Sequence, residues 1–206
     1  MPSSSQSRIA PVVGLATIIF TANALAIDTD YYVGMKVSSS DNIRLVDTDQ
    51  NEENETPLSA VSGIQVSEFS SLLELSGTAD FQYINYTENT FNNELLANAS
   101  LDAEVFILPQ SFHWTIEDDY GQVLGDTLQV PSPSNREDTN AFITGPDVYF
   151  RISNRDVLSL RGRFMDDWYE DQDYDNQRTI FGANYQRDLP GERTIGFFVS
   201  QMDVDY

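Results

Sequence analysis

The stretch from Leu72 to Val105 constrains the fold more than any other part of the chain. Its apolar residues alternate strictly with polar ones through two consecutive runs, which are separated by the polar gap 85–92. A β-strand turns successive side chains to opposite faces, whereas a helix would scatter them around its circumference. The pattern therefore predicts a long antiparallel hairpin with one apolar and one polar face. The apolar positions are Leu73, Leu75, Gly77, Ala79, Phe81 and Tyr83, then Leu95, Ala97, Ala99, Leu101, Ala103 and Val105.

The length of these two arms indicates a membrane setting. Each arm holds roughly ten to twelve patterned residues, which is what a tilted strand needs to cross an outer membrane, whereas soluble strands average about five or six. The hydrophobic content of 40% resembles that of a soluble protein. A transmembrane barrel also has moderate hydrophobicity, because its lipid-facing and water-facing residues alternate.

Charge and cysteine content narrow the classes of partner. The chain carries 33 acidic and 11 basic residues, with a formal charge of −22 and no cysteine. Nucleic acid is excluded as a partner, since phosphate binding needs a basic surface. The acidic excess favours solvent-facing acidic loops or a lumen that prefers cations.

Residues 1–26 read as a signal peptide. Arg8 supplies a positive start, an apolar core follows, and Ala24-Leu25-Ala26 gives the small-x-small pattern of a cleavage site. We therefore expect export, and a β-barrel domain over 27–206.

The remaining chain contains nine strand candidates, the first beginning near Asp30 and continuing towards Leu45, the last ending at Tyr206. Pro146 predicts an irregularity in the sixth, because proline cannot donate to a strand ladder. Short connections (67–71, 107–111, 153–156, 189–192) alternate with longer ones (47–57, 85–92, 125–139, 170–176). Outer-membrane barrels have short periplasmic turns and long extracellular loops, so we predict an all-β, antiparallel up-and-down transmembrane barrel in the cell outer membrane. A soluble secreted β-sandwich that serves as a binding module remains the alternative fold.

The export signal, Ser40-Asp41-Asn42 after tyrosine-rich strand residues, and the repeated hairpins resemble the outer-membrane β-barrel porins that accompany bacterial exosortase and exopolysaccharide loci. In this chain Ser40 stands where their Tyr-x-Asp-Asn-like element would have threonine, and the aromatic residue lies further upstream. The resemblance implies an outer-membrane barrel linked to polysaccharide export or surface assembly. The resemblance does not assign a catalytic role to any residue of this chain.

Alternation assigns a set of polar side chains to the water-facing side, which would line a lumen. Arg151, Arg161 and Arg163 are expected to pair there with Glu74, Asp102, Glu104 or Glu117 as a ladder that braces the strands. The other lumen-facing candidates are Thr78, Asp80, Asn98 and His113. His113 is the only histidine and no Gly-x-Ser-x-Gly motif accompanies it, so we expect neither a metal centre nor an enzyme.

The carboxylates of Asp171, Asp173 and Asp175 are spaced like the first ligands of a calcium loop, but Asn176 and Gly182 occupy positions that need Gly and Glu. An EF-hand is therefore rejected, and no cofactor is expected beyond weak cation binding by acidic loops. The pairs Asp118-Asp119 and Asp166-Asp167 are expected near strand ends, as solvated acidic positions.

Three functional classes follow from these features. The first is a porin or conduit for small solutes or polysaccharide, and the second is a non-conducting structural or adhesive surface barrel. The third, an enzyme, rests only on His113 and scattered carboxylates. Because nine strands cannot close as an all-antiparallel barrel, we expect an incomplete barrel whose first and last strands are not paired, and the chain to be the N-terminal portion of a larger one.

Overall fold

A computed structural model of the chain describes residues 27–45, 53–170 and 175–205, and these residues form an all-β fold. The strands alternate apolar and polar side chains, as the two-residue period requires. One 3-10 turn, η1 (Pro133–Asn135), is the helical element of the described residues. The strands are β1 (Asp28–Val37), β2 (Pro57–Phe69), β3 (Leu73–Tyr86), β4 (Glu94–Leu108), β5 (Phe112–Leu124), β6 (Arg136–Arg151), β7 (Asp156–Tyr169), β8 (Asn176–Leu189) and β9 (Arg193–Asp205).

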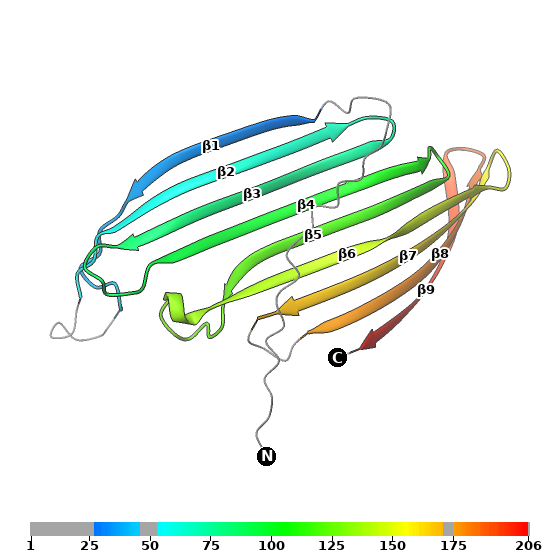
Figure 1. Cartoon of the computed structure of the whole chain (residues 1–206). Helices are drawn as coiled ribbons and strands as arrows, with labels where there is room; N and C mark the ends of the chain where they lie inside the picture. The colour runs from blue at the N-terminus through cyan, green and yellow to red at the C-terminus, as the bar shows by residue number, and fades with distance from the viewer. Residues whose placement is uncertain (1–26, 46–52, 171–174, 206) are drawn as a thin grey trace, which may run out of the picture.

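All nine strands lie in one antiparallel sheet, in the order β1-β2-β3-β4-β5-β6-β7-β8-β9 (Figure 1). Each strand pairs with its neighbours in the sequence, and β1 and β9 lie at opposite edges. The prediction that the first and last strands are not paired is therefore confirmed, and the sheet is an open one. Because eight reversals separate them, β1 and β9 run in the same direction.

Short and long connections alternate along the chain, as predicted. The longer ones (38–56, 87–93, 125–135, 170–175) join odd to even strands at one end of the sheet, and the shorter ones (70–72, 109–111, 152–155, 190–192) lie at the other end (Figure 1). Two predicted boundaries are wrong. The first strand ends at Val37 instead of continuing towards Leu45, and residues 136–139, expected in a loop, begin β6.

The irregularity expected at Pro146 lies inside β6 rather than at its start. In the ladder between β6 and β7, Thr144 pairs with Phe164 and Asp147 pairs with Arg161, while Gly145 and Pro146 between them have no partner. Gly145 has a φ of 158°, and a Cβ added there would lie 2.1 Å from the Gly162 carbonyl oxygen. Only a residue without a side chain fits this close approach of the two backbones.

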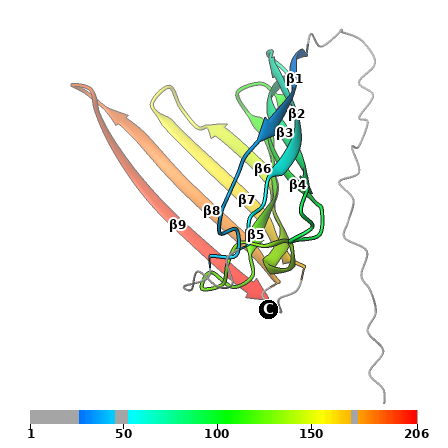
Figure 2. The ribbon, with the colours of Figure 1, turned by 90° about the vertical axis from the view of Figure 1, so that its left-hand side faces the viewer.

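The sheet is bent and twisted, so that β8 and β9 swing away from β1 to β4 (Figure 2). We call the face that carries Glu74 and its register partners the concave face, and the opposite face, which carries Leu75, the convex face. No second layer of described residues covers either face. Among the described residues, the buried hydrophobic side chains are Ile84 and Tyr86, so this sheet lacks the core that a β-sandwich would have.

No helix among the described residues is long and apolar enough to cross a membrane. The predicted signal peptide, residues 1–26, lies outside the described residues, as do Asp171 and Asp173 of the acidic loop.

Candidate functional site: a charged depression on the concave face

The polar residues predicted to face water share the concave face. Strand pairing sets Glu74 opposite Glu104, Thr78 opposite Ser100, and Asp80 opposite Asn98. Further along the same face, Asp102 lies opposite Glu117. Pairing continues this face to Arg151, Arg161 and Arg163, and His113 lies on it opposite Asp147.

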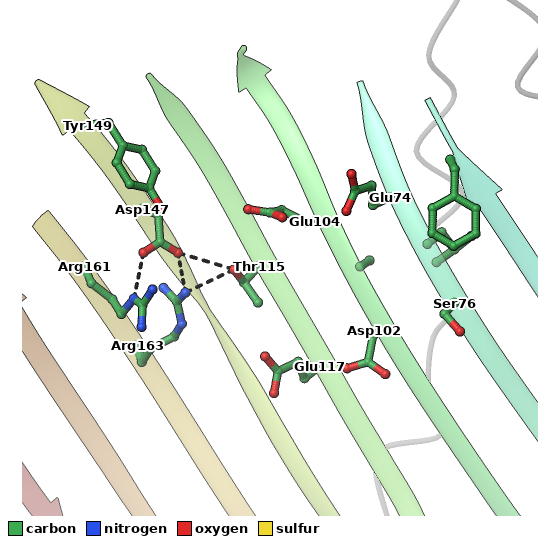
Figure 3. A pocket seen from close by; sticks show the side chains of 13 residues that line it. Glu74, Ser76, Asp102, Glu104, Thr115, Glu117, Asp147, Tyr149, Arg161 and Arg163 are labelled. Carbon is green, nitrogen blue, oxygen red and sulfur yellow. Dashed lines mark hydrogen bonds and ion pairs between the residues drawn. The ribbon is translucent and has the colours of Figure 1, made fainter. Parts of the chain in front are cut away.

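Asp147 is the centre of the most connected group on this face (Figure 3). Its side chain is 7% exposed. Arg161 Nε donates to Asp147 Oδ1 at 2.7 Å, and Arg163 Nη2 donates to Asp147 Oδ2. Arg163 Nη2 also donates to Thr115 Oγ1 at 3.1 Å, which ties β7 to β5 across β6. A buried carboxylate is stable only when such partners compensate for its lost hydration.

The two arginines of this group differ in how much of the side chain is exposed to solvent. Arg163 is nearly buried, with a side chain 14% exposed, and its other terminal nitrogen donates to the carbonyl oxygens of Pro146 and Gly162. The Arg161 side chain is 62% exposed. Arg163 therefore serves the fold, while the guanidinium of Arg161 presents donors to solvent.

Carboxylates gather on the neighbouring strands β3, β4 and β5. Glu74 lies directly opposite Glu104, and Asp102 lies directly opposite Glu117. Like charges at directly opposed positions of a sheet are destabilising. Within the described part of the chain, no basic side chain forms an ion pair with Glu74, Asp102 or Glu117.

His113 contacts this acidic group from its edge. Its Nδ1 lies 2.9 Å from Glu104 Oε1, and its ring packs edge-on against Phe106 at 4.7 Å and tilted against Tyr149 at 5.3 Å. Its Nε2 is buried without a hydrogen-bond partner. No serine or aspartate completes a catalytic arrangement with it among these contacts.

One depression of about 470 Å³, which we call the charged depression, is lined by both arginines and by the five carboxylates of Glu74, Asp102, Glu104, Glu117 and Asp147 (Figure 3). Four of the carboxylates lie on β3, β4 and β5, while both guanidiniums lie on β7 next to Asp147 of β6, so the charge is separated across the depression. A second hollow of about 540 Å³ continues from it towards β8 and β9 and shares Glu117, Asp147 and Arg161 with it. The concave face is therefore hollowed along several strands.

The predicted partners of the arginines are wrong. Arg161 and Arg163 pair with Asp147, not with Glu74, Asp102, Glu104 or Glu117. The sequence did indicate that Asp147 shares the face of the arginines, because Asp147, Tyr149 and Arg151 are two residues apart. It did not indicate that Asp147 is their partner, because the pairing depends on the register between β6 and β7.

Of the two acidic pairs predicted near strand ends, Asp166-Asp167 lies near the end of β7 as expected, whereas Asp118-Asp119 lies in the middle of β5. Asp118 lies in the middle of β5 on the convex face, where its carboxylate accepts a hydrogen bond from Asn140 Nδ2 at 2.9 Å. Asp166 lies on the same face of β7. Among the described residues, no group of three or more His, Asp or Glu is arranged to hold a metal ion.

A second organised region lies where the long connections meet. Glu55 is 1% exposed, and its carboxylate accepts backbone N–H groups of Thr56 and Glu88 at 3.0 Å and of Thr90 at 3.2 Å. Arg44 pairs with Glu53 at 2.9 Å and donates to the Thr90 carbonyl oxygen at 3.0 Å. These contacts join the connection 38–56 to the connection 87–93.

Comparisons of the chain with protein-family models, with curated proteins and with solved structures give no significant match.

Proposed function

We propose that this sheet forms part of the wall of an outer-membrane β-barrel that serves as a cation-preferring conduit. The observation that supports this most is the contrast between its two faces. The convex face is apolar and exposed, and the concave face is polar, charged and hollowed.

The convex face exposes large apolar side chains on strand after strand. On β1, Tyr31, Val33 and Met35 are each at least 75% exposed, because no other described residues cover them. Exposed apolar patches of this extent mark surfaces that contact a partner or a membrane. Contact with lipid explains all of these exposed apolar side chains together. The others on the convex face include Ile64, Phe81, Tyr83, Leu95, Leu160, Phe181, Phe197 and Val199.

The polar residues of the convex face are consistent with tilted strands. Asp118, Asn140 and Asp166 lie in β5, β6 and β7, on the half nearer the long connections or at mid-strand. On β2 and β3 apolar side chains reach close to the same end. Strands of membrane barrels tilt by about 35–45°, so a level apolar belt crosses them diagonally.

The concave face supports a preference for cations. The charged depression is lined by five carboxylates and two guanidiniums, a formal charge of −3. Clustered carboxylates on a pore wall raise the local concentration of cations.

The directions of the two edge strands determine how such a barrel can close. β1 and β9 run the same way, so an all-antiparallel barrel that contains this sheet needs an odd number of further strands between them. A seam that joins two parallel edges is the other solution.

Conductance in planar lipid bilayers tests the proposal. We expect purified protein to give stable currents whose reversal potential under a KCl gradient has the sign of potassium selectivity. The variant Asp102→Asn/Glu117→Gln should lose part of that selectivity, while Asp30→Asn, a concave-face change outside the depression, should leave it unchanged. Folded protein that inserts but stays silent would contradict the conduit and favour a non-conducting surface barrel.

The organised contacts between long connections favour that second function. The buried carboxylate of Glu55 bonds to the backbone of Glu88 and Thr90 and so holds these described parts of two long connections together, as an adhesive or structural surface needs. If the conduit is correct, the resemblance to porins of exopolysaccharide loci makes an exported polysaccharide or a small solute the cargo. Comparing the block of the current by small cations with that by an acidic polysaccharide separates these two cargoes.

A further inference from the structure

We infer that the charged depression is a binding site for small organic cations that also carry a carboxylate, of which a basic amino acid is the simplest form. The inference rests on the proposed function in placing this face towards water that solutes enter. It goes beyond that function in assigning a solute class and an orientation.

The first step concerns the acidic side of the depression. Glu74, Asp102 and Glu117 have no basic partner among the described residues, and two pairs of carboxylates oppose each other directly. An ammonium group placed between opposed carboxylates relieves their repulsion and forms charge-assisted hydrogen bonds. A neutral or anionic solute gains nothing there.

The second step concerns the basic side. Asp147 accepts Arg161 through Nε, and Tyr149 of the same lining also bonds to this guanidinium. The Arg161 side chain is nevertheless 62% exposed, so it keeps donors that a solute can reach. A guanidinium fork fits a carboxylate in two-point geometry. Arg163 cannot take this role, because its donors are used by Thr115, Asp147 and two backbone carbonyls.

The third step is the separation of the two charges. The carboxylates of β3, β4 and β5 and the exposed guanidinium of Arg161 lie on different strands but line a single hollow of about 470 Å³. This volume is within the range of small-molecule sites, about 300–1,000 Å³. A solute with an ammonium at one end and a carboxylate at the other therefore spans the depression in one orientation. Because the lining has a net charge of −3, a solute with net positive charge is favoured over a neutral zwitterion.

Equilibrium titration of the full chain in detergent tests this without requiring a current. The probes are L-lysine, cadaverine, which lacks the carboxylate, and 6-aminohexanoate, which lacks the second ammonium. We expect L-lysine to bind at least fivefold more tightly than either analogue at low ionic strength. Equal binding of lysine and cadaverine by the unaltered protein would overturn the inference.

Two variants assign the ends of the solute. Arg161→Gln should weaken lysine about fivefold and leave cadaverine unchanged, while Glu117→Gln should weaken both. Arg151→Gln, a concave-face arginine outside the depression, is the matched control and should change neither. If Arg161→Gln leaves the ratio of lysine to cadaverine affinity unaltered, the site is not oriented as inferred.

These outcomes separate the inference from the conduit. A barrel that conducts potassium but binds the three probes equally retains the proposed function and loses the solute site. A barrel that binds lysine in the expected order but passes no current loses the conduit and retains the site.

Discussion

Asp147 is the residue on which the concave face depends most. It is nearly buried and compensates two guanidiniums, one of which is itself nearly buried. Removing one partner of a buried ion pair costs about 3–5 kcal/mol, because the remaining charge is left without compensation. We therefore expect Asp147→Asn to lower the free energy of unfolding by about 3 kcal/mol, measured by urea unfolding in lipid vesicles.

Glu74→Gln is the control for this change. Glu74 is exposed on the same face and has no ion-pair partner among the described residues, so we expect a change within about 0.5 kcal/mol. Similar losses for both substitutions would show that Asp147 does not organise this group.

The carboxylate of Glu55 should make the contacts between the long connections depend on pH. Burial raises the pKa of Glu55, but the backbone N–H donors of Glu88, Thr90 and Thr56 outweigh it and hold the pKa below its ordinary value of 4.5. A carboxyl whose pKa is lowered by folding stabilises the folded form above the unfolded value, and this contribution is lost as pH falls through the folded value. The clamp should therefore hold at neutral pH and open only below about pH 4.5.

Amide hydrogen exchange measures this opening. Corrected for the intrinsic effect of pH, exchange at Glu88 and Thr90 should accelerate as pH falls below 4.5, and Glu55→Gln should accelerate it already at neutral pH. Glu53→Gln, which removes only the exposed pair with Arg44, is the control. Protection that does not depend on pH would show that the Glu55 carboxylate does not hold the two connections together.

At the scale of the strands, the two faces make opposite predictions for the same substitution. Arginine on the lipid face of a barrel costs about 2–4 kcal/mol at the membrane midplane, whereas arginine on the water face costs little. Leu75→Arg or Leu101→Arg, on the convex face, should impair assembly in vesicles more than Thr78→Arg or Ser100→Arg on the concave face. Equal tolerance of all four would contradict the proposed facing.

The close approach of β6 and β7 is sensitive to one methyl group. Because a Cβ at position 145 would lie 2.1 Å from the Gly162 carbonyl oxygen, Gly145→Ala must separate the two strands. Overpacking of this kind costs about 1–3 kcal/mol, and we expect a loss in that range by urea unfolding. Gly182→Ala, whose Cβ would meet its nearest atom at an ordinary 3.4 Å, should cost less.

At the scale of the whole sheet, the alternation in the sequence was enough to predict the nine strands and their faces. In the two runs 73–83 and 95–105 every second side chain is apolar or glycine, so the two-residue period fixes both strand and orientation. The start of β6 was missed because Arg136–Thr139 is polar, and the ladder there is held by backbone pairing with β5 and by bonds such as that from Gln122 Nε2 to Asp138 Oδ1 at 2.7 Å. Backbone pairing does not require apolar side chains.

The sequence was enough to predict which residues share the face of the candidate site, but not which of them form ion pairs with one another. Alternation places Glu104, Arg161 and Asp147 on one face from the sequence alone. Which carboxylate an arginine meets depends on the register of neighbouring strands, and around Gly145 that ladder is interrupted. Register is a property of two strands together, so the pairing with Asp147 could only be found in the structure.

The purely sequential order of the strands also bears on how such a sheet assembles and how its length can change. Every hydrogen-bonded neighbour is adjacent along the chain, so contacts are local and each new strand can add to the edge already formed, without waiting for a distant segment. Two consecutive strands form a unit that can be removed or duplicated without reversing any other strand or moving a loop to the opposite end. The hairpin is therefore the natural step in which a wall of this kind grows, and changing the number of hairpins changes its girth while preserving which end of every remaining strand bears the long connections.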